Sequence, residues 1–123
     1  ASALQWLEAT PEELLYLSVI TLAEIRRGIE RLDDDHPRRG ALQTWLEHDL
    51  RLRFASRLLP FDEAVALRWG HIEGWAERHG KALATIDAQL AATALHHGLT
   101  LVTRNTPDYR PSGVPIFNPW SPG

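Results

Sequence analysis

Apolar residues follow two patterns along the chain: short runs rich in β-branched or aromatic residues, and longer stripes at helical spacing. The runs at 15–20 (LYLSVI), 99–103 (LTLVT) and 114–117 (VPIF) predict buried strands, and 57–61 (RLLPF) predicts a short extended piece. The stripes predict helices, and these cover residues 2–8, 21–32, 37–50, 62–79 and 86–97. Strands that alternate with helices, without hairpin turns between them, are typical of an α/β fold with a parallel sheet and right-handed crossovers.

Several residues mark the ends of these helices. Asp62 is a favoured N-cap, and Gly80 stands where a C′ glycine is expected. Pro37 suits the first turn of its helix, on which four apolar residues are expected to face inward: Leu42, Trp45, Leu46 and Leu50. The alanine-rich stretch 86–97 predicts a helix packed closely against a neighbour.

The predicted strands are few for so many helices, which indicates that a strand is missing from the sheet.

Composition narrows the class of protein. The chain has 123 residues, which predicts a single domain spanning 1–123. Its 44% hydrophobic and 24% charged residues are close to globular averages and argue against disorder. The absence of cysteine excludes disulfides and thiolate metal sites, and fits a cytoplasmic protein. No apolar run approaches the roughly 18 residues of a membrane span, and a net charge of −3 gives no overall basic signature for nucleic-acid binding.

Carboxylates near the expected carboxyl ends of the strands are the candidate chemistry. The sequence contains no GxxxxGK[ST] or GxGxxG phosphate loop, no HExxH motif and no GxSxG elbow. Glu24 follows the first strand by about one helical turn, and Asp87 opens the helix that leads into the strand at 99–103. Asn105 and Asp108 lie in the loop that leaves that strand. Oxygen ligands gathered at one sheet edge suit Mg²⁺ or Mn²⁺, ions that promote phosphodiester cleavage.

Each of these acids also has a structural interpretation, which the sequence leaves open. Thr21 to Glu24 form a T-x-x-E pattern, so Glu24 can simply complete a capping box at the start of its helix. The helix dipole favours Asp87 in a first turn, and Asp108 after Pro107 suits an ordinary turn.

Four segments in order resemble PIN-domain toxins of the VapC type, in the FitB-like subgroup: LYLSVITLAEIRRGIERL, RLLPFDEAVALRWG, IDAQLAATALHHGLTLVTRN and VPIFNPW. The resemblance runs from about Leu15 to Trp120 and implies a parallel β-sheet flanked by helices on both sides. Members of that family begin with a central strand close to LLDTN, whose aspartate is a principal metal ligand, and nothing here matches it. We therefore expect an N-terminally truncated, single PIN-like domain that lacks the first, central strand, binds metal weakly and has little activity.

The resemblance also implies a function. It predicts a toxin of a type II toxin–antitoxin system, an endoribonuclease dependent on Mg²⁺ or Mn²⁺ that cleaves RNA such as tRNA. A VapB-type antitoxin is the implied partner, in a complex built on a homodimer, with no membrane involved. Glu24 matches the acid of the family's T-x-A-E helix, and Asp87 matches that of its D-x-x-I-A-A-T-A helix. Asn105 takes the place after V-T-R where some members have an aspartate, and Asp108 follows one turn later.

On this interpretation, Asp87 and Glu24 hold the metal and Asn105 assists from outside the ligand set. Candidates for binding RNA phosphates are Arg26, Arg27 and Arg104, although a helix-face arginine is more often a solvated salt-bridge partner. The alternative hypothesis is a non-catalytic module that binds an antitoxin helix in a hydrophobic groove and acts with it as a corepressor at DNA. Metal-dependent RNA cleavage that is lost in Asp87→Asn separates the enzyme from the module.

Overall fold

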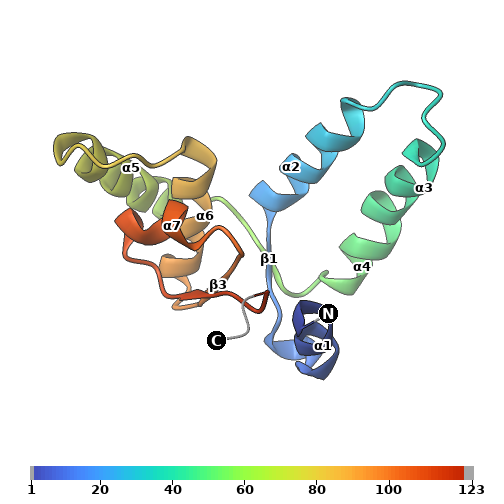
Figure 1. The fold of residues 1–123 in the computed structure, drawn as a ribbon, viewed down its shortest axis with the longest axis horizontal. Helices are drawn as coiled ribbons and strands as arrows, with labels where there is room; N and C mark the ends of the chain where they lie inside the picture. The colour runs from blue at the N-terminus through green and yellow to red at the C-terminus, as the bar shows by residue number, and fades with distance from the viewer. Residues whose placement is uncertain (1, 121–123) are drawn as a thin grey trace.

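Helices surround two pairs of short parallel strands in the computed structural model, which describes residues 2–120 (Figure 1). The elements are α1 (Ser2–Ala9), η1 (Glu12–Leu14), β1 (Leu17–Ser18), α2 (Val19–Glu30), α3 (Arg39–Thr44), η2 (Trp45–Leu50), α4 (Arg51–Arg53), β2 (Leu58–Leu59), α5 (Glu63–Arg78), α6 (Thr85–His96), β3 (Leu101–Val102), α7 (Thr106–Tyr109), η3 (Arg110–Ser112) and β4 (Ile116–Phe117). The predicted α/β class is therefore confirmed. Within residues 2–120, no helix has the length and apolar character needed to cross a bilayer.

The strands form two separate pairs rather than one sheet. β1 pairs in parallel with β2, and β3 pairs in parallel with β4. Among the described residues, neither β1 nor β3 has a second partner strand. A groove of about 900 Å³ lies where the two pairs approach, and both β1 and β3 contribute to its walls, together with Trp6 of α1 and Leu90 of α6. The expectation that a central strand is missing stays a prediction.

Helices α5 and α6 form the best-packed part of the molecule and lie side by side in Figure 1. Val65 of α5 and Ala88, Ala91 and Ala92 of α6 are completely buried. The small alanine side chains let the two helix backbones approach, as the alanine-rich sequence predicts. Gly80 follows α5 with a φ of +64°, a left-handed conformation that glycine adopts at little cost.

The N-cap of α5 gives a testable contribution to stability. The Asp62 carboxylate accepts a hydrogen bond from the Val65 backbone N–H at 3.1 Å, which confirms the predicted cap. We expect Asp62→Ala to lower the free energy of unfolding by about 1 kcal/mol, because it leaves that N–H without its partner. Urea unfolding measures the change, and Asp62→Asn is the control that keeps an acceptor at this position. Equal losses in the two variants would contradict the cap as the cause.

The start of α2 corrects the sequence prediction. The strand predicted at 15–20 is only Leu17–Ser18, and the helix begins at Val19. The Ser18 hydroxyl accepts a hydrogen bond from the Ile20 backbone N–H at 3.0 Å and so caps the helix. Thr21 and Glu24 therefore lie inside α2, and the capping-box interpretation of Glu24 is wrong.

Helix α2 and the continuous helical segment from α3 to α4 form a hairpin that projects from the rest of the fold (Figure 1). Its core contains Ile29, Leu46 and Leu50, all buried. Trp45 was expected to face inward but is 39% exposed. Trp45 is the first residue of a π-helical turn over Trp45–Leu50, and the buried residues of that turn are Leu46 and Leu50.

Candidate functional site

Three carboxylates come from three different elements to one region. Glu24 stands on α2, Asp87 in the first turn of α6, and Asp108 on the short helix α7. Helix α6 packs against both α2 and α7, which brings these three elements together. Asp87 is partly buried, whereas Glu24 and Asp108 are exposed. The acids therefore belong to one accessible face, as the sequence interpretation requires.

Tyr109 lies within electrostatic reach of all three carboxylates. Its side chain is only 6% exposed and packs beside Ala91, Ala94 and Val114. Burial raises the pKa of the Tyr109 hydroxyl well above its usual range. The negative charge of Asp87, a hydrogen bond from the hydroxyl to that carboxylate, and the charges of Glu24 and Asp108 raise this pKa further. All three acids thus lie within electrostatic reach of one buried hydroxyl.

The raised pKa of Tyr109 predicts a specific loss of stability in alkali. The folded state holds the phenol proton more tightly than the unfolded chain, so protonated Tyr109 contributes to the free energy of unfolding. This contribution is fully present below about pH 10 and is lost as the pH rises further. We expect the free energy of unfolding to fall more steeply in the wild type than in Tyr109→Phe between about pH 9 and about pH 11. Urea titrations in EDTA measure both slopes. Tyr16→Phe removes an exposed tyrosine and should keep the wild-type slope of the free energy of unfolding against pH. Equal slopes for the wild type and both variants would contradict the prediction.

The donor set suits a hard divalent cation. The three carboxylates offer only oxygen ligands, which Mg²⁺ and Mn²⁺ prefer. Within residues 2–120, no three histidine, aspartate or glutamate side chains converge closely enough to enclose an ion by themselves. An open site of this kind fits Mg²⁺, since that ion usually keeps several waters and is bound by one or two carboxylates together with substrate phosphates.

No side-chain interaction of the described residues brings Asn105 into this group, although its backbone carbonyl accepts a hydrogen bond from the Asp108 backbone N–H at 3.1 Å. It is exposed and occupies the N-cap position of α7, but its side chain makes no capping hydrogen bond. Its backbone N–H donates instead to the Thr103 hydroxyl at 3.1 Å.

The candidate arginines differ in their surroundings. Arg26 forms ion pairs with Glu30 at 3.4 Å and Glu47 at 3.2 Å, which agrees with the salt-bridge interpretation. Arg104 lies over the ring of Trp120, 5.2 Å from its centroid. Arg27 is exposed and makes no ion pair with another described residue. It stands three residues after Glu24 on α2, and therefore on the same face of the helix.

Sequence reasoning missed Tyr109. It treated the segment after β3 as a polar loop, whereas the segment folds into α7 and η3 and buries this tyrosine. The available signal was a single large aromatic residue within the otherwise polar and proline-rich stretch PDYRP. Such a residue is more often anchored in the core than left in solvent.

Comparisons with known proteins show the family of the chain. The PIN domain family model matches residues 1–109. The chain is 42% identical over 115 residues to Toxin FitB of Neisseria gonorrhoeae, a match that covers 94% of this chain and 82% of that protein. It is 36% identical over 121 residues to VapC ribonuclease Y4jK of Sinorhizobium fredii, covering 98% of this chain and 86% of that protein.

Solved structures give the same result. The structure of FitAB bound to an IR36 DNA fragment contains a chain that matches with a TM-score of 0.88 and 38% identity, over 98% of this chain and 83% of that one. The crystal structure of FitAcB from Neisseria gonorrhoeae matches with a TM-score of 0.87 and 41% identity, over 95% of this chain and 84% of that one. The protein therefore belongs to the PIN-domain family, in its VapC-type, FitB-like group.

Proposed function

We propose that this protein is the toxin of a toxin–antitoxin pair and acts as an endoribonuclease dependent on Mg²⁺ or Mn²⁺. The observation that carries the proposal is that α6 packs against both α2 and α7 and so brings Asp87, Glu24 and Asp108 to one region. Relatives named as ribonucleases support the class of reaction. Structured RNA such as tRNA is the proposed substrate.

Asp87 and Glu24 are the proposed ligands of the ion, and Asp108 is a candidate third. When bound, the ion activates a water molecule and stabilises the leaving oxygen in phosphodiester cleavage. We assign to the Tyr109 hydroxyl, which lies within electrostatic reach of Asp87, a hydrogen bond that restrains that carboxylate in the orientation needed to bind. Tyr109 is thus a positioning residue. Because it is buried and its pKa is raised, it stays protonated at neutral pH and can keep donating.

Polar and basic side chains near the three carboxylates are the proposed substrate-binding groups. Arg27 shares a helix face with Glu24 and has no described ion-pair partner, so it is better placed to bind a phosphate than Arg26, which two glutamates already engage. Asn105, exposed at the start of α7, can offer its amide to the RNA. Arg104 is the further phosphate candidate, beside Trp120.

The proposed partner is a VapB-type antitoxin, in a cytoplasmic complex built on a homodimer. Matching structures are of FitAB and VapBC complexes, which supports a partner of that kind. The FitAB structure is bound to a DNA fragment, as are two of the VapBC structures. That observation favours a second candidate function, in which the protein acts with its antitoxin as a corepressor at DNA without cleaving RNA.

RNA cleavage with and without divalent ions tests the proposal. The purified protein should cleave tRNA or total RNA in Mg²⁺ or Mn²⁺, slowly because weak metal binding is expected for this chain, and EDTA should stop the reaction. Intact binding of the antitoxin and of DNA, without cleavage in any divalent ion, would favour the corepressor over the nuclease. Contamination by another ribonuclease is excluded by a parallel preparation of Asp87→Asn.

A further inference from the structure

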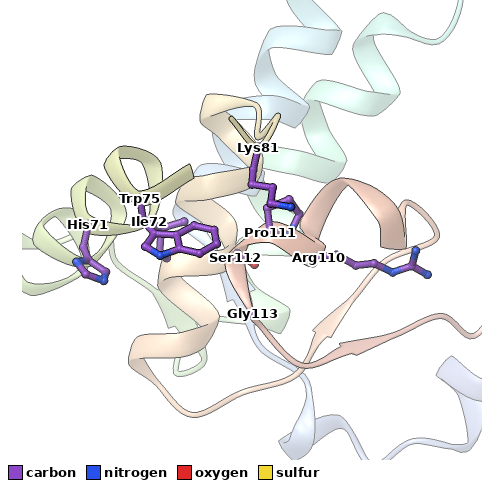
Figure 2. Close-up of a pocket in the computed structure, with 8 residues that line it drawn as sticks. All are labelled: His71, Ile72, Trp75, Lys81, Arg110, Pro111, Ser112 and Gly113. Atoms are coloured by element: carbon purple, nitrogen blue, oxygen red, sulfur yellow. The ribbon is translucent and has the colours of Figure 1, made fainter. Parts of the chain in front are cut away.

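A second pocket opens between α5 and the η3 segment (Figure 2). It has a volume of about 590 Å³. Its walls combine the apolar surfaces of Ile72, Trp75 and Pro111 with three basic residues, His71, Lys81 and Arg110. No carboxylate is among its described lining residues, although acidic residues outnumber lysine and arginine in the chain by 16 to 13. The pocket therefore combines an aromatic wall with local positive charge.

Trp75 gives the pocket a fixed aromatic surface. Its indole is 38% exposed and stacks on the ring of His79, with the centroids 4.2 Å apart and the planes inclined by 22°. The His79 Nδ1 is also 2.8 Å from the Trp75 carbonyl oxygen, within hydrogen-bonding distance. These contacts hold the indole in place, so a flat ligand can stack on it without first ordering the side chain.

Lys81 is the only lysine of the chain. It is exposed, and neither it nor Arg110 makes an ion pair with another described residue. In Figure 2 the Lys81 side chain extends toward Pro111, while the Arg110 guanidinium points away from the indole. Lys81 is thus the cation best placed to meet an anionic group next to a ligand stacked on Trp75.

Two short chain connections tie this pocket to the acidic site. Arg110 directly follows Tyr109, the residue that contacts Asp87. Lys81 lies in the loop that leads into α6, six residues before Asp87, and six residues of fully extended chain span at most about 20 Å. A few nucleotides of single-stranded RNA cover such a distance.

We propose that this pocket binds one unpaired nucleotide of the RNA substrate, a few nucleotides from the scissile phosphate, with the base on Trp75 and a phosphate on Lys81. The inference rests on the ribonuclease function proposed above. An aromatic platform with an adjacent cation is the pattern by which proteins hold unpaired bases. A site for inorganic phosphate alone has no need of the indole, and a partner peptide would have to be acidic to satisfy the same cations.

Fluorescence anisotropy with labelled single-stranded RNA of mixed sequence tests the proposal, in EDTA so that binding is measured without cleavage. We expect Trp75→Ala to raise the Kd about tenfold, the usual effect of losing one stacked base. Lys81→Gln should raise the Kd several-fold. It should also reduce the slope of log Kd against log salt concentration by about one, because one phosphate contact is lost. Because Lys81 is exposed, this second variant tests the pocket even if Trp75→Ala folds poorly.

Matched controls are Trp45→Ala, which removes an indole 39% exposed on the projecting hairpin, and Arg68→Gln, which removes an exposed cation elsewhere on α5. Both should bind RNA like the wild type.

The proposal that the pocket binds a nucleotide is contradicted if Trp75→Ala and Lys81→Gln bind RNA with wild-type affinity. It is also contradicted if the protein binds a poly-glutamate peptide more tightly than RNA. If the wild type cleaves RNA in Mn²⁺ but these variants bind normally, only the pocket assignment fails. A wild type that neither binds nor cleaves RNA overturns the proposed function and the pocket with it.

Discussion

Asp87→Asn should reduce the rate of RNA cleavage by at least about 100-fold, the largest functional effect that this account predicts. The change removes the negative charge of the partly buried carboxylate in the first turn of α6 and so weakens the proposed ion site. The amide keeps the size of the carboxyl group, and its oxygen can still accept the hydrogen bond from Tyr109. The fold should therefore survive, and the loss should lie in metal binding and rate.

Initial rates of cleavage over a range of Mn²⁺ concentrations measure this effect. Circular dichroism spectra and urea midpoints establish that the variant is folded. Asp35→Asn is the control, since it removes an exposed aspartate from the loop between α2 and α3 and should cleave at the wild-type rate. Unchanged cleavage in Asp87→Asn would show that this carboxylate does not hold the catalytic ion.

Ala92→Leu should produce the largest loss of stability among conservative apolar changes. Ala92 is completely buried between α6 and α5, in the cluster that includes Val65 and Ile72. A leucine there has no free volume, so the helices must separate or side chains must adopt strained rotamers. The expected reduction in the free energy of unfolding is roughly 1–3 kcal/mol.

The matched control uses the same substitution at an exposed helical position. Ala64 lies in the first turn of α5 with its side chain in solvent, and Ala64→Leu should change stability by less than about 0.5 kcal/mol. Urea unfolding followed by circular dichroism measures both. Equal stability of the two variants would mean that α5 and α6 are not closely packed at Ala92.

The sequence was most informative where local chemistry determines the structure. Asp62 and Gly80 bracket α5 through a cap and a left-handed residue, both of which act over a few residues. The alanines of α6 predicted close packing because their small side chains let a neighbouring element approach, and their burial confirms it.

The errors arose where one local signal competed with another. Ser18 and Thr21 are both good caps three residues apart, and only the structure shows that Ser18 is used. Trp45 fits the apolar stripe at ordinary helical spacing, but it is 39% exposed at the start of a π-helical turn. A change of helical register depends on packing across the whole hairpin, which short-range spacing does not record.

The candidate site divides in the same way. Glu24, Asp87 and Asp108 could be proposed from their positions relative to the predicted strands, and they do share one region. Their common electrostatic effect on Tyr109 could not be predicted, because it depends on the packing of α7 against α6. The pocket beside Trp75 could not be predicted from the sequence either. Its walls come from α5 and η3, which are about 35 residues apart along the chain.

Paramagnetic line broadening by Mn²⁺ in the isotope-labelled protein tests most directly whether these acids hold a divalent ion. The account predicts that substoichiometric Mn²⁺ first broadens the amide signals of residues around Glu24, Asp87 and Tyr109, and that EDTA restores them. The triple aspartate 33–35 provides an internal comparison, because it has more adjacent negative charge but lies in an exposed loop at the end of α2. Broadening that starts at that loop, or that spreads evenly over the molecule, would contradict the account.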